Sequence, residues 1–88
     1  MVSETFKITN EEGLTMRPAQ VFVCAMDKYS SAITIKFKNK AINGKSIISL
    51  MAGGIKCGSE ITVECSGGDE NEMLSEVKEL IESGLGEK

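Results

Sequence analysis

The residues with the clearest capacity for chemistry lie in one short run, Gly13-Leu14-Thr15-Met16-Arg17-Pro18-Ala19. Pro18 indicates the first turn of a helix, because its fixed φ suits that turn and its missing N–H is not needed there. Such a turn leaves backbone N–H groups free, and these attract anions. Arg17 is the only arginine in the chain, and its planar fork of donors matches phosphate. The run predicts a small anion site beside Thr15 or, as the alternative, an ordinary helix start with a solvated Arg17.

A second run, Asn43-Gly44-Lys45-Ser46-Ile47-Ile48-Ser49-Leu50-Met51, is typical of a turn followed by a short apolar helix. Ser46 is a good N-cap, because its hydroxyl can accept a hydrogen bond from the N–H two or three residues on. The Gly53-Gly54 pair predicts a left-handed end to this helix. A helix this short cannot bury Ile47, Ile48, Leu50 and Met51 against one sheet. We therefore expect an exposed apolar patch suited to a partner; the alternative is that both isoleucines lie under loops.

Taken together, the two runs resemble the phosphocarrier HPr family, and the resemblance covers roughly residues 2 to 84. In that family the first run is Gly-Leu-His-Ala-Arg-Pro-Ala, and the second contains Lys-Ser-Ile next to Leu-Met. The phosphoacceptor histidine of the family falls on Thr15, and the chain contains no histidine. Met16 and Gly44 also depart from the usual family residues. The resemblance therefore indicates a histidine-less, Crh-like member with a degenerate phosphoacceptor position.

The family's histidine takes phosphate from a phosphoenolpyruvate-driven kinase and passes it to sugar-transport proteins. A threonine hydroxyl is a weak nucleophile without an adjacent base, and the sequence places neither Glu11 nor Glu12 as that base. A phosphothreonine ester would also be too stable to serve as a relay. We therefore expect no catalytic residue, and no transfer to a sugar transporter through Thr15. The alternative is a working phosphocarrier that uses Thr15 or another residue.

The resemblance implies a regulatory role for Ser46. In Gram-positive members of the family, a dedicated serine kinase phosphorylates the matching serine from ATP, and the product binds a transcriptional regulator of carbon catabolism. The histidine-less branch keeps only this role. The chain is thus interpreted as a regulatory module, not an enzyme, whose partners are the serine kinase and a transcriptional regulator or phosphotransferase-system proteins. A repurposed binding domain is the further alternative. The expected docking surface consists of Thr15, Met16, Arg17, Gln20, Ile47, Ile48 and Met51.

Composition limits the class of protein. The net charge is −3, and the acidic residues are concentrated after residue 58, so the chain lacks the basic excess of a nucleic-acid binder. No apolar run approaches the ~20 residues of a membrane span. Cys24, Cys57 and Cys65 lack metal-ligand spacing and are odd in number, which favours free thiols in the cytoplasm. We expect neither a metal nor a cofactor. Cys24 is predicted to face outward and Cys65 to lie in the core.

The 88 residues predict one domain in which strands and helices mix. Alternation and helical stripes predict strands at 2–9, 32–38, 41–42 and 60–66, and helices at 18–29, 46–52 and 69–83. Asp69 followed by Glu72 resembles a capping box, and residues 85–88 are expected to fray. This order favours an α+β two-layer open-faced sandwich with three helices on one face of the sheet. The resemblance implies a four-stranded antiparallel sheet in the order 1-4-2-3.

Overall fold

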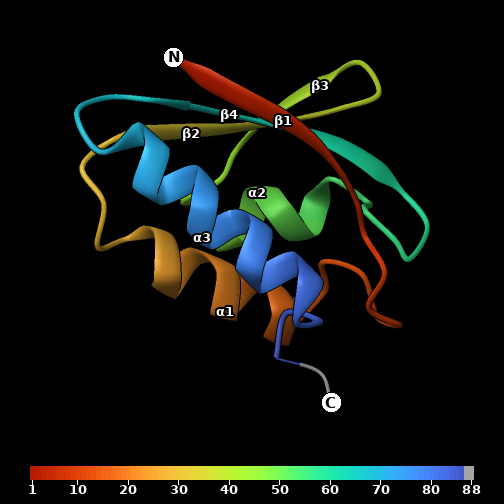
Figure 1. The fold of residues 1–88 in the computed structure, drawn as a ribbon. Coiled ribbons are helices and arrows are strands. Elements are labelled where there is room, and N and C mark those ends of the chain that lie inside the picture. Colours follow the sequence, from red (N-terminus) through yellow and green to blue (C-terminus); the bar gives the residue numbers. More distant parts are fainter. Residues whose placement is uncertain (87–88) are drawn as a thin grey trace.

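The fold, a computed structural model that describes residues 1–86, has a four-stranded sheet and three helices in the order βαββαβα (Figure 1). The elements are β1 (Val2–Lys7), α1 (Met16–Met26), β2 (Ala32–Phe37), β3 (Lys40–Asn43), α2 (Ile47–Ala52), β4 (Glu60–Ser66) and α3 (Glu70–Glu82). The predicted elements are all present, and their boundaries differ by a few residues. No helix of residues 1–86 is long and apolar enough to cross a membrane.

The sheet is antiparallel throughout, in the order β1-β4-β2-β3, which confirms the order implied by the resemblance. The register places Val2 opposite Cys65 and Phe6 opposite Ile61. On the other side of β4, Ile35 lies opposite Val63. Because successive side chains of a strand point to opposite faces, the apolar positions of all four strands line a single face.

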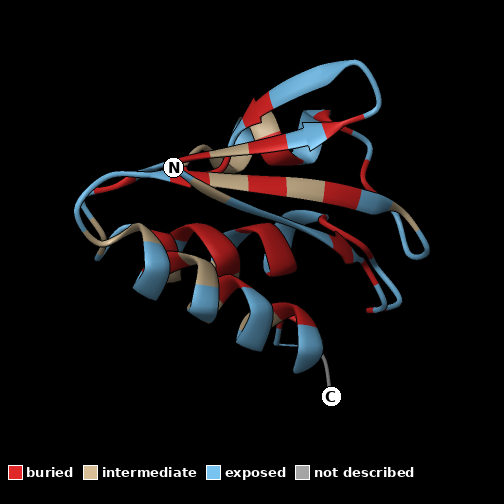
Figure 2. Ribbon diagram, turned by 45° about the horizontal axis from the view of Figure 1, so that its top comes forward, coloured by how far each residue is buried: buried red, intermediate tan, exposed pale blue. Residues whose placement is uncertain are grey.

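The three helices cover that apolar face, and the other face of the sheet is open to solvent (Figure 1). Each helix turns its buried side toward the sheet (Figure 2). The core is built mainly from aliphatic side chains and methionine, with few aromatic rings. Its fully buried members include Phe22, Met26, Ile35, Leu50, Ile61, Val63, Cys65, Met73 and Val77.

Helix α1 begins two residues before Pro18 and ends at Met26, so the predicted span of 18–29 was displaced at both ends. Pro18 is the third helical residue, where its missing N–H still costs no helical hydrogen bond. At the other end, the N–H of Tyr29 donates to the carbonyl of Met26 at 3.1 Å, which closes a tight turn. Tyr29 therefore lies beyond the helix, half-buried against the core.

The predicted capping box at the start of α3 was wrong. The side chain of Asp69 caps no N–H of α3. Its carboxylate instead accepts hydrogen bonds from the N–H of Ser30 at 3.0 Å, the N–H of Ser31 at 2.9 Å and the hydroxyl of Ser31. The long-range partners occupy the oxygens that a local cap would need. This carboxylate ties the loop after α1 to the loop before α3.

The prediction of a frayed tail was wrong at Leu85. Its side chain is only 1% exposed, and its N–H donates to the carbonyl of Leu80 at 2.9 Å. The chain reverses after Ser83, so a residue outside the helix returns to the core. Residues 87–88 lie outside the described part of the chain.

Candidate functional site

The loop before α1 is anchored through its backbone. The N–H of Leu14 donates to the carbonyl of Ile55 at 3.0 Å, and the side-chain amide of Asn10 donates to the carbonyl of Gly13 at 2.7 Å. Gly13 itself has a φ of +68°, in the left-handed region that suits glycine. These contacts join the loop to the segment after α2 and determine where Thr15 emerges.

Thr15 occupies the N-cap position of α1 with an extended backbone, φ −85° and ψ −167°. Its side chain makes no capping hydrogen bond. The hydroxyl instead donates to Oε1 of Glu12 at 3.2 Å, so a carboxylate does lie next to the exposed hydroxyl. The sequence analysis named Glu12 but could not place it, because charge and spacing alone do not show that the turn at 10–14 brings residues 12 and 15 together.

Arg17 and Gln20 are exposed on the first turns of α1. Within the described part of the chain, no carboxylate forms an ion pair with Arg17. Its guanidinium is thus presented to solvent beside the uncapped start of an 11-residue helix. This arrangement is compatible with the predicted anion site, which stays a prediction.

Ser46 is the N-cap of α2, as predicted. Its hydroxyl oxygen accepts a hydrogen bond from the N–H of Ser49 at 3.2 Å, and its side chain is half-buried. The neighbouring Lys45 does not extend into solvent. Its ammonium donates to the carbonyl of Tyr29 at 2.7 Å. Gly44, which departs from the family pattern, donates its N–H to the carbonyl of Ile33 at 2.9 Å.

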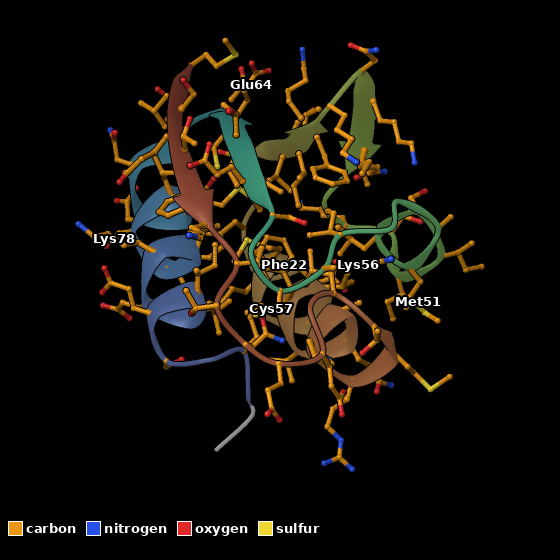
Figure 3. All side chains as sticks on the ribbon, turned by 90° about the vertical axis from the view of Figure 1, so that its right-hand side faces the viewer. Phe22, Met51, Lys56, Cys57, Glu64 and Lys78 are labelled. Atoms are coloured by element: carbon orange, nitrogen blue, oxygen red, sulfur yellow. The ribbon has the colours of Figure 1, made fainter. Side chains whose placement is uncertain are left out.

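Three large apolar side chains are exposed on α1 and α2. Ile48 is 80% exposed, Met16 66% and Met51 40%. Met51 points away from the body of the molecule, whereas Phe22 lies inside it (Figure 3). Ile47, in contrast, is half-buried and packs against the core. The predicted exposed patch is therefore confirmed for Ile48 and Met51. The packing of α1 against α2 brings the helices that carry the predicted docking surface together.

A polar cluster joins the loop after α1 to α3. The hydroxyl of Tyr29 donates to Oε1 of Glu76 at 2.6 Å, and the ammonium of Lys28 lies 2.8 Å from the same oxygen. The hydrogen bond to Glu76, together with partial burial, raises the pKa of Tyr29 to about 12. The hydrogen bonds that Glu76 accepts from Lys28 and Tyr29 lower the pKa of its carboxyl group, and Lys28 has the larger effect. The hydroxyl of Ser31 and the neighbouring N–H groups likewise lower the pKa of Asp69.

The predicted placements of Cys24 and Cys65 are confirmed. Cys24 and Cys57 are exposed, and Cys65 is buried, where desolvation raises the pKa of its thiol. Across residues 1–86, no group of three or more cysteine or acidic side chains is arranged to hold a metal ion.

The fold and the site define a small open-faced α+β domain that presents an exposed apolar patch, an exposed arginine and a serine N-cap on adjacent helices. A protein-family model, described as the phosphotransferase-system HPr component phosphorylation site, matches residues 2–83. The chain therefore belongs to the HPr family of the phosphotransferase system, as the sequence resemblance indicated.

Solved structures agree with this assignment. An HPr from Thermoanaerobacter tengcongensis is 39% identical, covers 100% of this chain and 99% of its own, and superposes with a TM-score of 0.95. The histidine-containing phosphocarrier protein from Mycoplasma is 38% identical over 96% of this chain and 97% of its own, with a TM-score of 0.88. Crh, the catabolite repression protein of Bacillus subtilis, is 30% identical over 96% of this chain and 97% of its own, with a TM-score of 0.76.

Proposed function

We propose that this chain is a regulatory member of the HPr family that is modified on Ser46 and has left the phosphate relay. The observation that carries the proposal is the position of Thr15, which stands where the family's phosphoacceptor histidine would be in a chain without histidine. An imidazole is nucleophilic near neutral pH, and its phosphate bond is labile. A threonine hydroxyl provides neither property. Similarity to Crh, whose name refers to catabolite repression, supports a role of this kind.

Ser46 is suited to act as a charge switch. A kinase of the family would move the γ-phosphoryl group of ATP to Oγ of Ser46, releasing ADP and a proton. The ester adds about −1.5 to −2 charges, and a helix N-terminus favours negative charge by roughly 0.3–1 kcal/mol. We expect the backbone to stay in place while the surface beside Ile48 and Met51 becomes negative. Such a change selects partners through electrostatic complementarity, which fits a transcriptional regulator of carbon catabolism.

The second candidate is a phosphocarrier that uses Thr15. The hydrogen bond from Thr15 to Glu12 favours it, because a nucleophilic hydroxyl needs an adjacent base. The stability of a phosphothreonine ester argues against onward transfer. This candidate therefore predicts labelling from phosphoenolpyruvate, whereas the regulatory proposal predicts labelling from ATP.

Intact mass with site mapping after two parallel incubations separates the candidates. One tube contains ATP and the family's serine kinase, and the other contains phosphoenolpyruvate and the first enzyme of the transport system. We expect one phosphate on Ser46 in the first tube and none in the second. Ser46→Ala should abolish the label, whereas Ser49→Ala, a matched change on the same helix, should keep it.

An acid-stable phosphate on Thr15 in the second tube would contradict the proposal and support the carrier. No phosphate in either tube would also contradict it, and would leave a repurposed binding domain. Transfer of a label from Thr15 to a sugar-transport acceptor would establish a working relay.

A further inference from the structure

Lys40 and Lys45, at the start of β3 and just after it, each donate to a backbone carbonyl in the segment that follows a helix. Neither α1 nor α2 has a basic residue in its own last turn. The ammonium of Lys40, at the start of β3, donates to the carbonyl of Gly53 after α2 at 3.2 Å. The ammonium of Lys45, just after β3, donates to the carbonyl of Tyr29 in the turn after α1 at 2.7 Å. The carbonyl of Gly53, at the C-cap of α2, lacks a helical donor and carries negative partial charge, so Lys40 supplies a donor that this helix lacks. Tyr29 lies beyond the C-cap of α1, so Lys45 binds a carbonyl of the following loop.

The contact of Lys45 braces the turn that leads to Ser46. Within this turn, the N–H of Lys45 donates to the side-chain oxygen of Asn43 at 2.9 Å, and the N–H of Ser46 donates to the backbone carbonyl of Asn43 at 3.1 Å. These bonds are local and set the shape of the turn, and the N–H of Gly44 holds its first half on β2 by donating to the carbonyl of Ile33 at 2.9 Å. The ammonium of Lys45 ties the second half of the turn to the segment after α1.

The anchor at Tyr29 is itself held in place. Its hydroxyl is bound by Glu76 of α3, which also pairs with Lys28. The next residues, Ser30 and Ser31, donate their N–H groups to Asp69. The carbonyl that receives the ammonium of Lys45 thus belongs to a segment fixed at two points, by Glu76 in α3 and by Asp69 just before that helix.

We propose that Lys45 is a positioning residue of the Ser46 site, whose ammonium, held by the Tyr29 carbonyl, fixes the 43–46 turn and so the orientation of the Ser46 hydroxyl. The ammonium group of Lys45 is then bound to a neutral carbonyl and is not available to a partner as an exposed positive charge. The inference rests on the proposed function only in taking Ser46 as the group that a kinase modifies.

The test compares three variants of the full chain. Lys45→Met removes the donor and keeps the length of the side chain, and Lys45→Arg keeps a cationic donor. Lys56→Met removes one positive charge from an exposed lysine elsewhere and is the charge-matched control. Amide hydrogen exchange of the free protein is the first readout. The amides of Ser46 and Ser49 should exchange roughly fivefold to tenfold faster in Lys45→Met, from the typical net contribution of one hydrogen bond.

The amides of β4 should exchange at the wild-type rate in every variant, which distinguishes a local effect from global destabilisation. The Ser46 and Ser49 amides should exchange at near wild-type rates in Lys45→Arg and Lys56→Met. The second readout is phosphorylation of Ser46 by the family's serine kinase with ATP. We expect kcat/KM to fall severalfold in Lys45→Met, mainly through kcat, with Lys45→Arg restoring most of it and Lys56→Met leaving it unchanged.

Unchanged exchange at Ser46 and Ser49 in Lys45→Met would overturn the inference. Faster exchange with an unchanged kcat/KM would overturn it as well, because the turn would then not govern how the hydroxyl is presented. If the wild-type chain takes no phosphate from ATP, the proposed function fails, and hydrogen exchange alone then decides whether Lys45 fixes the turn.

Discussion

The loop that presents Thr15 depends on a glycine in close contact with backbone. A Cβ added at Gly13 would lie 2.5 Å from the carbonyl oxygen of Ile55 and 2.7 Å from the Cα of Lys56. Both neighbours are backbone atoms, so no flexible side chain can move aside. Gly54 is the natural comparison, because its φ of +73° is close to the +68° of Gly13, yet a Cβ there would meet nothing within 4 Å.

The two positions allow the effect of conformation to be separated from the effect of contact. A non-glycine residue in the left-handed region costs roughly 1–2 kcal/mol, and this applies to Gly13→Ala and Gly54→Ala alike. Forcing extra volume into a packed site costs a further ~1–3 kcal/mol, and this applies to Gly13→Ala alone. We therefore expect a loss of about 2–5 kcal/mol in the free energy of unfolding for Gly13→Ala, against about 1–2 kcal/mol for Gly54→Ala.

Urea unfolding followed by circular dichroism measures both values. The free energy of unfolding of a small domain is only about 5–15 kcal/mol. Gly13→Ala should therefore lower the urea concentration at the unfolding midpoint clearly, while the protein remains folded without urea. The reasoning is refuted if Gly13→Ala is no more destabilising than Gly54→Ala. In that case the backbone approach to Ile55 does not hold the loop.

Three further predictions concern the N-cap and the polar groups. Ser46→Ala should lower the free energy of unfolding, measured with urea, by roughly 0.5–2 kcal/mol. Ser46→Asp should leave it nearly unchanged, because Asp caps a helix as well as Ser does. Equal losses in the two variants would show that Ser46 does not stabilise the fold by capping. Tyr29 is the only tyrosine in a chain without tryptophan, so an ultraviolet titration should give its pKa near 12, and Glu76→Gln should move it toward 10. Since folding raises this pKa, the stability that Tyr29 contributes is complete below pH 10 and is lost as the pH rises toward 12. A titration midpoint of Tyr29 near pH 10 in the folded wild-type protein would contradict the hydrogen bond to Glu76. Folding lowers the pKa of Asp69, so the stability that this carboxylate contributes is present above pH 3.8 and is lost as the pH falls below that value. Asp69→Asn should therefore reduce the loss of unfolding free energy in that acidic range. An unchanged pH dependence in this variant would exclude the bonds between Asp69 and Ser31 as the source of the acid-sensitive stability.

Local patterns in the sequence were enough to predict the elements and, of the two predicted side-chain N-caps, the one at Ser46. Alternation in the strands and apolar stripes in the helices have one physical cause each, burial on one face. Ser46 acts as a cap because its donor lies three residues away, within reach of any residue in that position. Gly54 likewise has the left-handed φ that the Gly53-Gly54 pair predicted. The strand order, in contrast, was predicted only from the family resemblance, because a short stretch of sequence does not show which strands pair with one another.

The predictions that failed involve partners far away in the sequence. Asp69 has the right spacing for a cap, but Ser31, which lies 38 residues earlier in the sequence, competes for its carboxylate. Leu85 was assigned to a tail because it follows the glycine that ends α3, yet the chain turns back and buries it. The bond between Thr15 and Glu12 is local but depends on the loop that Gly13 docks on Ile55. Each case needs tertiary structure to choose between acceptable local arrangements.

The strand order also sets the sequence of events during synthesis. Strand β1 pairs only with β4, with Val2 opposite Cys65 and Lys7 opposite Glu60. The first strand of this domain to be synthesised must therefore wait for the last, which takes roughly 3 to 10 s at a translation rate of ~5–20 residues per second. The apolar faces of α1 and α2 wait with it, because β4 lies at the centre of the sheet that they help to cover. During synthesis the domain thus carries an unpaired β1 until nearly all of its residues have emerged, and its folding is limited by long-range pairing.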